Sequence, residues 1–365
     1  MNVNDIFMYI FAIGVLIGGV DYLLGNKYGY GEKFQEAVKL MAPTVFNMVG
    51  IICLTPAIAV VIRMALVPLY ELVGIDPGML GGVLAIDMGG HSLAMELCND
   101  MAIGEYSGIL VGSTLGCSLV FSIPIGMGII KRETQGDYLT GVIYGLIAMP
   151  FGLIVGGLVQ GLHILVILFQ SIPVLILSLF LIIGLWKFPN VLVRFFMTFA
   201  KGLKILMTIG LIIAVVLYLL GIETEYITPI TQGMNVVVGI TLTLMGSLPI
   251  AKLLIAILSK PMAIVGKGIG ISKEACGAIL IGLVSAVPVY TMLDDMDKKS
   301  RIVVSAFLIN GMAILGAHFG YAATNAPDMV GPMLTCKIIG AVGTVLITLF
   351  CKSFKKKHPC GTPLV

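Results

Sequence analysis

The sequence has 365 residues, of which 58% are hydrophobic and only 11% are charged, with a formal net charge of +3. An average soluble domain carries roughly 25% charged residues, so this composition excludes an ordinary soluble protein and indicates an integral membrane protein. Basic residues do not form a patch interleaved with aromatic residues, so no nucleic-acid partner is expected.

Eleven apolar segments follow one another along the chain, and most have the roughly 20 residues that a helix needs to cross a hydrocarbon core. They cover residues 5–24, 42–70, 79–98, 107–130, 138–160, 164–186, 205–221, 232–258, 275–293, 302–323 and 330–351. The strict alternation of a transmembrane barrel is missing, which predicts an all-α polytopic membrane protein. The first segment has no basic n-region and no cleavage site, so we interpret it as a retained span.

Metal and cofactor sites are not expected from the sequence. The seven cysteines show no C-x-x-C spacing, and most lie in apolar segments, where cysteine behaves as a small hydrophobic residue. His91, His163 and His318 also lack a metal-like spacing.

Two halves of the chain resemble each other at a constant offset of 196 residues. Ile13–Gly25 matches Ile209–Gly221, and the stretch that begins at Gly74 matches the one that begins at Gly270. We therefore expect two five-segment transmembrane repeats joined by one helix. The predicted division is a first repeat at 1–160, a connecting helix and inner loop at 161–200, a second repeat at 201–351 and a basic cytoplasmic tail at 352–365.

The distribution of Lys and Arg predicts that segments 79–98 and 275–293 do not cross the membrane. If all eleven segments crossed, the basic residues of the loops would divide ten against nine, although cytoplasmic loops should hold most of them. If these two segments are re-entrant hairpins, nine crossings remain, and nineteen basic residues face the cytoplasm with none outside. The predicted inner segments then include 131–137, 187–204 and 259–273, and residues 222–230 are predicted outside. The N-terminus then lies outside, the C-terminus lies in the cytoplasm, and the repeats are inverted, as in many secondary transporters.

The turns of these two hairpins are the predicted substrate site. Met88, Gly89 and Gly90 are expected to form the first turn, with Asp87 and His91 beside it, and residues 285–288 the second. An ionised carboxylate at membrane depth costs several kcal/mol unless it is paired, so Asp87 is predicted to bind a cation. The alternative is a structural carboxylate that caps a helix.

Other candidate binding residues lie in the two hairpin segments and in or directly after the tenth segment, 302–323. Ser285 and Tyr290 are plausible hydrogen-bonding groups for a small ligand. Glu96 would lie nearer the outer mouth, either as an attractor of cations or as a solvated charge. His318 is by default a hydrogen-bonded core residue, with a role in a cavity as the alternative. Asn325 at the outer end of segment ten is more often a helix cap than a ligand.

Several motifs in order resemble the ethanolamine permease family, EutH. They are Ile86–Gly90 followed by Leu93, Ala94, Glu96 and Leu97, then FSIPIGMGII at 121–130, MLDDMDKKSR followed by Ala306 and Phe307, and GAHFGYAATN at 316–325. The resemblance covers nearly the whole chain. One departure is Ala317, where relatives can carry an acidic residue before the histidine, so a carboxylate role at that position is in doubt.

The resemblance implies uptake of ethanolamine across the bacterial cytoplasmic membrane and no enzymatic activity of the chain itself. The predicted site suits this substrate, because a protonated amino alcohol needs a carboxylate and a few hydroxyl or carbonyl partners. Coupling to a proton or sodium ion, and assembly into a homo-oligomer, are left open by the sequence. The alternatives are a carrier of the same architecture for another small amine or a nucleoside and, more distantly, a membrane-embedded lipid headgroup enzyme.

Overall fold

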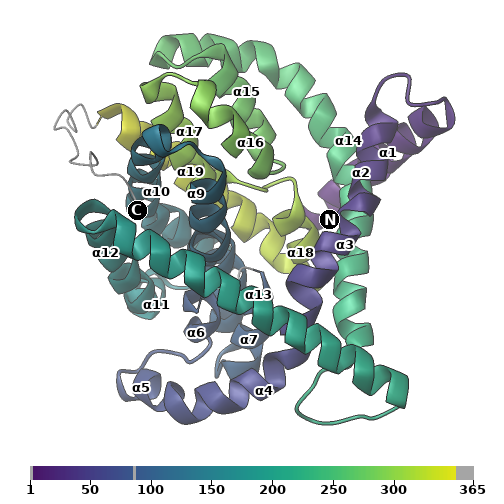
Figure 1. The fold of residues 1–365 in the computed structure, drawn as a ribbon, viewed down its shortest axis with the longest axis vertical. Coiled ribbons are helices and arrows are strands. Elements are labelled where there is room, and N and C mark those ends of the chain that lie inside the picture. Colours follow the sequence, from purple (N-terminus) through teal and green to yellow (C-terminus); the bar gives the residue numbers. More distant parts are fainter. Residues whose placement is uncertain (1–2, 85–87, 351–365) are drawn as a thin grey trace.

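The computed structural model describes residues 3–84 and 88–350, and in these residues it contains helices, one isolated bridge between Thr224 and Ile227, and no strand (Figure 1). The helices are α1 (Val3–Leu23), α2 (Tyr30–Lys39), α3 (Met41–Thr44), η1 (Val45–Val49), α4 (Gly50–Ala65), α5 (Val67–Leu72), α6 (Met79–Val83), α7 (Gly89–Leu97), α8 (Met101–Glu105), η2 (Tyr106–Gly116), η3 (Ser118–Ser122), α9 (Ile123–Ile129), α10 (Arg132–Gln160), α11 (Ile164–Gln170), α12 (Ile172–Lys187), α13 (Pro189–Leu220), α14 (Ile230–Ile269), α15 (Lys273–Gly282), α16 (Val287–Met292), η4 (Leu293–Asp295), α17 (Lys298–Gly311), α18 (Ala317–Asn325), η5 (Pro327–Met329) and α19 (Val330–Phe350).

Many of the helices are long enough to cross a membrane. Within the described residues, seven continuous stretches have at least 18 residues and sufficient hydropathy, and the pair α11 and α12, bent by 51°, would make an eighth as one span. The seven are Val3–Leu23, Tyr30–Ala65, Met101–Ile129, Arg132–Gln160, Pro189–Leu220, Ile230–Ile269 and Pro327–Phe350. The prediction of an all-α polytopic membrane protein is confirmed. The predicted segments 79–98, 275–293 and 302–323 are each divided into shorter helices.

The third predicted segment reverses direction between α6 and α7. The Asp76 carboxylate, just before α6, accepts the backbone N–H groups of Asn99 (3.1 Å) and Asp100 (2.9 Å), which follow α7. The two ends of the segment therefore lie together. The expected turn at Met88–Gly90 is wrong for two of its residues, because α7 already begins at Gly89 and includes Gly90.

The ninth predicted segment reverses in the same way between α15 and α16. The backbone N–H of Ser272, which precedes α15, donates to Ser300 Oγ at 2.8 Å on α17. Ser272 lies 196 residues after Asp76, and its bond joins the start of the ninth segment to α17, the helix that follows it. The expected turn at 285–288 also begins earlier, because α15 ends at Gly282 and Pro288 is already in the first turn of α16. Proline suits that position, because its missing N–H would have no partner inside the helix.

The tenth predicted segment is a broken helix. α17 ends at Gly311, α18 begins at Ala317, and Ala313 between them has a left-handed backbone with a φ of 56°. This irregular backbone pairs with the second hairpin, because Ala313 N–H donates to the Gly282 carbonyl (3.0 Å) and Leu315 N–H to the Leu283 carbonyl (2.8 Å). The break and the hairpin turn are thus held together by main-chain bonds.

Equivalent glycines bring the two halves of the chain into contact. A Cβ on Gly14 of α1 would lie 2.2 Å from the carbonyl oxygen of Gly246 on α14. A Cβ on Gly210 of α13 would lie 2.3 Å from the carbonyl oxygen of Gly50 on α4. Gly14 and Gly210, like Gly50 and Gly246, are 196 residues apart. The same helix contact therefore occurs twice, each time between one half and the other, and Figure 1 shows α1 beside α14 at one edge.

Candidate functional site

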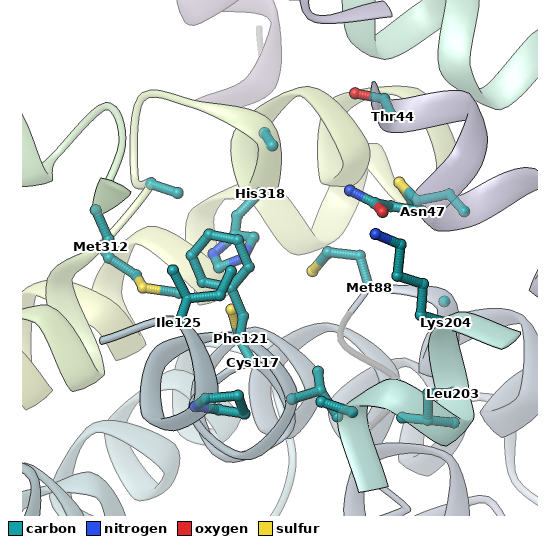
Figure 2. Close-up of a pocket in the computed structure, with 18 of the residues that line it drawn as sticks. Thr44, Asn47, Met88, Cys117, Phe121, Ile125, Leu203, Lys204, Met312 and His318 are labelled. Carbon is teal, nitrogen blue, oxygen red and sulfur yellow. The ribbon is translucent and has the colours of Figure 1, made fainter. Parts of the chain in front are cut away.

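A pocket of about 630 Å³ lies where the two hairpin turns, the break between α17 and α18, and the middle of α13 meet (Figure 2). Its wall combines apolar, sulfur-containing and a few polar side chains. The lining residues are Thr44, Asn47, Met48, Met88, Gly89, Cys117, Val120, Phe121, Pro124, Ile125, Met197, Ala200, Lys201, Leu203, Lys204, Met207, Val284, Ser285, Ala286, Met312, Ala313, Ala317 and His318. A small organic molecule fits a pocket of this size and composition.

The centre of the pocket is built from equivalent positions of the two halves. Met88 and Gly89 from the first hairpin are 196 residues before Val284 and Ser285 from the second, and all four line the pocket. The same relation holds for two further lining pairs, which are Cys117 with Ala313 and Phe121 with Ala317. The pocket therefore lies between equivalent positions of the two halves of the sequence.

The side of the pocket formed by α13 and η1 has no such equivalence. Asn47 and Lys204 extend into the pocket from the side opposite Met312 and Ile125 (Figure 2). The positions equivalent to Asn47 and Lys204 are Thr243 on α14 and Met8 on α1, and neither is among the described residues that line the pocket. The pocket is thus lined by α13 and η1, whereas the equivalent helices α1 and α14 do not line it.

The second hairpin turn is held rigidly at the pocket. Besides the main-chain bonds to Ala313 and Leu315, Gly316 packs against the turn so closely that a Cβ would lie 2.1 Å from the Val284 carbonyl oxygen. Only glycine allows this approach of two backbones. Ser285 therefore projects from a turn whose position is fixed by the break in the neighbouring helix.

Among the described residues that line the pocket, the charged side chains are Lys201 and Lys204 on α13, and no carboxylate is among them. His318 at the start of α18 adds an imidazole, which lies across the pocket from Lys204 (Figure 2). Four of the predicted site residues are brought together here, namely Met88, Gly89, Ser285 and His318.

Asp87, the strongest candidate in the sequence, lies outside the described residues. It directly precedes Met88 in the chain. Gly90 lies behind the pocket wall, where a Cβ would approach the carbonyl oxygen of Gly81 to 2.5 Å and force the arms of the first hairpin apart.

His91 lies within one helical turn of the pocket residue Gly89 and joins the first hairpin to the broken helix. Its Nδ1 is 3.2 Å from the Tyr321 hydroxyl, and the two rings meet edge to face at 5.7 Å. His91 follows the pocket residue Gly89 by two positions, and Tyr321 follows the pocket residue His318 by three. Both residues are buried. We call this contact the His91–Tyr321 link.

Three predicted site residues lie away from the pocket. Tyr290 is fully buried and packs edge to face on Tyr138, with ring centroids 5.9 Å apart. Glu96 is 46% exposed and lies 3.6 Å from Arg63, as a surface ion pair. The Asn325 side chain donates to the Tyr321 carbonyl, one turn back in its own helix. The structure thus places these three among packing and surface contacts.

The sequence did not point to the side of the pocket made by Asn47, Lys201 and Lys204. The two lysines fall in the predicted inner segment 187–204, where their charges predict which side of the membrane the segment faces and do not predict a contact with a ligand. They also lie three residues apart on one helix, and this i, i+3 spacing would have shown that they share a face.

Comparison with known proteins identifies the family. The model of the ethanolamine utilisation protein family EutH matches residues 3–351. The chain is 35% identical over 352 residues to the probable ethanolamine permease EutH of Listeria monocytogenes, covering 96% of this chain and 94% of the relative. It is 33% identical to the protein of the same name from Escherichia coli K12, covering 96% and 95%, and 31% identical to the uncharacterized protein YxeR of Bacillus subtilis, covering 94% and 93%. No solved structure matches. A match over nearly the whole chain, together with relatives above 30% identity, shows that this chain belongs to the EutH family of ethanolamine utilisation proteins.

Proposed function

We propose that this chain carries protonated ethanolamine across the bacterial cytoplasmic membrane and binds it in the pocket between the two hairpin turns. The observation that carries the proposal is the meeting of both turns and the helix break at one pocket, in a chain whose relatives are named probable ethanolamine permeases. Transporters with internal repeats place their substrate sites at such junctions.

The proposed topology has nine crossings and two inverted repeats. Segments 79–98 and 275–293 are re-entrant, since each returns to its starting point through the contacts of Asp76 and Ser272. The broken helix α17–α18 and the bent pair α11–α12 each count as one crossing. The reciprocal contacts of Gly14 and Gly210 support a two-fold relation between the repeats, 1–160 and 201–351. The N-terminus lies outside and the tail at 352–365 in the cytoplasm.

The charges around the pocket orient the substrate. Lys201 and Lys204 repel an ammonium group, so this end of ethanolamine points away from α13 and toward the hairpin turns. We assign Asp87 as its counter-charge, on the basis of the sequence, because an ammonium ion in a partly dry pocket needs an anionic partner. The substrate hydroxyl then lies near Asn47 and Lys204, which both carry hydrogen-bond donors.

The conformation described here is proposed to be open to the cytoplasm. Lys201 and Lys204 belong to the predicted inner segment 187–204, and Phe121–Ile125 lead toward the predicted inner loop at 131–137. The His91–Tyr321 link lies on the other side of the turns and closes the outer path. The helices equivalent to α13 and η1 are α1 and α14, and they do not line the pocket in this conformation. If the two halves exchanged their conformations, α1 and α14 would line the pocket and it would open to the outer side instead.

Uptake of radiolabelled ethanolamine into proteoliposomes tests the proposal. We expect saturable uptake into liposomes that contain the protein, above the rate of empty liposomes. Excess unlabelled ethanolamine should compete, whereas a nucleoside such as adenosine should not. Uptake equal to that of empty liposomes would overturn the proposed function, and competition by the nucleoside alone would favour the alternative substrate.

Cysteine labelling tests the topology. In a cysteine-free background, Gly268→Cys is expected to react with a membrane-impermeant thiol reagent only from the cytoplasmic side, and Glu225→Cys only from the outer side. Gly268 has no atom within 4 Å of the added Cβ, so the substitution is tolerated. If all eleven segments crossed, both residues would change sides, so the opposite pair of results would overturn the hairpin assignment.

Loss of the His91–Tyr321 link is expected to make the pocket more accessible from outside. A neutral hydrogen bond contributes about 0.5–1.5 kcal/mol, so Tyr321→Phe should raise the outward-open population roughly two- to tenfold. The readout is the rate at which Ala317→Cys, a position on the pocket wall, reacts with an impermeant reagent added outside. Tyr106→Phe is the matched control, because it removes another buried tyrosine bond, to Ser171. An unchanged rate in Tyr321→Phe would contradict the role of the link.

A further inference from the structure

One buried charge lies beside the pocket without lining it. Lys337 is 0% exposed in the middle of α19, and the other lysines of the described residues are at least partly exposed. A lysine side chain at membrane depth is costly unless its ammonium group is satisfied, so such residues are commonly functional. Lys337 is not among the nineteen basic residues that predict the orientation, because it lies inside an apolar segment and not in a loop.

The Lys337 ammonium group is bound by main-chain carbonyl oxygens. Its Nζ donates to the carbonyl of Met312 (3.1 Å) and to the carbonyl of Ser113 (2.8 Å). Met312 directly follows α17, so its carbonyl belongs to the electronegative C-terminal end of that helix. Ser113 lies in η2, a wide π-helix of the first repeat. The ammonium group therefore joins the broken helix of one repeat to an irregular helix of the other.

This arrangement resembles a bound metal cation. In carriers built from broken helices, unwound carbonyls and the C-terminal ends of half-helices coordinate the coupling sodium ion. Here one carbonyl at the break between α17 and α18, that of Met312, and one in the irregular helix η2, that of Ser113, bind a charge that is covalently attached to α19. A protonated lysine carries the same single positive charge as sodium and donates hydrogen bonds to the oxygens that sodium would coordinate.

The break that Lys337 holds also forms the pocket. Met312 and Ala313 line it, and the Ala313 and Leu315 N–H groups bond to the second hairpin at Gly282 and Leu283. A displacement of Met312 would therefore be transmitted to Ser285 at the turn. Lys337 is not among the described residues that line the pocket, and its bond to the Met312 carbonyl gives it a route to the pocket through the break, as a positioning residue.

We propose that Lys337 is a fixed internal cation that replaces a coupling sodium ion at the helix break and keeps the second hairpin turn in place. Two consequences follow. The break and the turn keep their structure without sodium, and ethanolamine uptake does not depend on a sodium gradient. The second consequence rests on the proposed function, whereas the first does not.

Hydrogen exchange tests the positioning role without reference to transport. In Lys337→Met, the amides of Ala313 and Leu315 are expected to exchange roughly tenfold faster than in the native protein, because their segment loses its anchor. Lys252→Met is the matched control, since Lys252 also donates to a carbonyl, that of Tyr28 at 2.8 Å, but far from the break in sequence and outside the pocket. The control should leave both amides unchanged. The positioning role would be overturned if exchange became faster evenly over the whole protein, or if the amides of Ala313 and Leu315 exchanged no faster than in the native protein.

A second substitution separates charge from hydrogen bonding and remains informative if Lys337→Met does not fold. Lys337→Gln keeps a hydrogen-bond donor but removes the charge. The amides of Ala313 and Leu315 should therefore exchange as fast in this variant as in Lys337→Met. Native protection in Lys337→Gln would show that a neutral donor is sufficient and would overturn the assignment of a cation.

Uptake into proteoliposomes tests the replacement of sodium. The native protein should take up ethanolamine at rates that differ by less than about twofold when sodium is replaced by potassium on both sides, because no ion needs to fill the break. A sodium stimulation of tenfold or more would overturn the replacement. If the native protein shows no ethanolamine uptake in either salt, the proposed function fails, and the exchange experiment still decides the positioning role.

Discussion

Asp87→Asn is expected to lower the efficiency of ethanolamine uptake, Vmax/KM, by roughly 30- to 800-fold. The neutral amide cannot balance the substrate's ammonium group, and an unpaired charge in a partly dry site costs about 2–4 kcal/mol. The wall of the pocket makes this dependence stronger, because the charges on its described residues are Lys201 and Lys204. The measurement is the initial uptake rate in proteoliposomes over a range of substrate concentrations.

Glu96→Gln is the control for this prediction. Glu96 was also a candidate in the sequence, but its side chain is 46% exposed and pairs with Arg63. Exposed ion pairs contribute about 0–1 kcal/mol, so the uptake efficiency of this variant should fall by less than about fivefold. Native uptake by Asp87→Asn would remove the carboxylate from the mechanism, and an equal loss in both variants would indicate a general effect of negative charge at the surface.

The all-helical fold, and some contacts within it, could be predicted from patterns that extend over the whole sequence. An offset of 196 residues relates Gly14 to Gly210, and in the structure these glycines occupy equivalent helix contacts. The reversal of segments 79–98 and 275–293 was also expected from the charges of the loops, and the contacts of Asp76 and Ser272 bring the start of each segment close to the residues that follow it. Both signals depend on many residues at once, so errors of a few residues in the boundaries do not change them.

The side chains that face the pocket were harder to predict, because a position in a segment does not determine a direction. His91 and Tyr290 are close in sequence to the turns, yet one contacts Tyr321 and the other packs on Tyr138. Some residues of the expected turns lie in helices instead, because α7 begins at Gly89 and Pro288 lies in the first turn of α16.

Local sequence patterns could not predict contacts between segments that are distant in the chain. Lys204 reaches the pocket because α13 crosses the face of the molecule, as Figure 1 shows. Lys337 donates to the carbonyls of Met312, 25 residues earlier in the chain, and of Ser113, 224 residues earlier. Irregular backbone supplies these carbonyls, and the sequence carries no periodic signal for a π-helix or for the exact point of a helix break.

The arms of the two hairpins should respond in opposite ways to the same substitution at equivalent positions. Gly81 and Gly277 are 196 residues apart, on α6 and α15. A Cβ on Gly81 would lie 2.5 Å from the backbone N of Ala94 and from the carbonyl oxygen of Gly90, whereas a Cβ on Gly277 meets nothing within 4 Å. Gly81→Ala is therefore expected to lower the free energy of unfolding by about 1–3 kcal/mol, as overpacking does.

Gly277→Ala should instead raise the free energy of unfolding by up to about 1 kcal/mol, because alanine loses less backbone entropy than glycine in a helix. Thermal unfolding in detergent can be followed by the reaction of a thiol dye with the buried cysteines 53, 117, 276 and 336. The unfolding temperature should fall in Gly81→Ala and stay level or rise in Gly277→Ala. Uptake should also fall only in the first variant, because separation of the arms displaces Met88 and Gly89 at the pocket. Equal stability of the two variants would mean that α6 and α7 are not packed as tightly as the backbone contact at Gly81 requires, and the first hairpin would then lack the rigidity that the binding site needs.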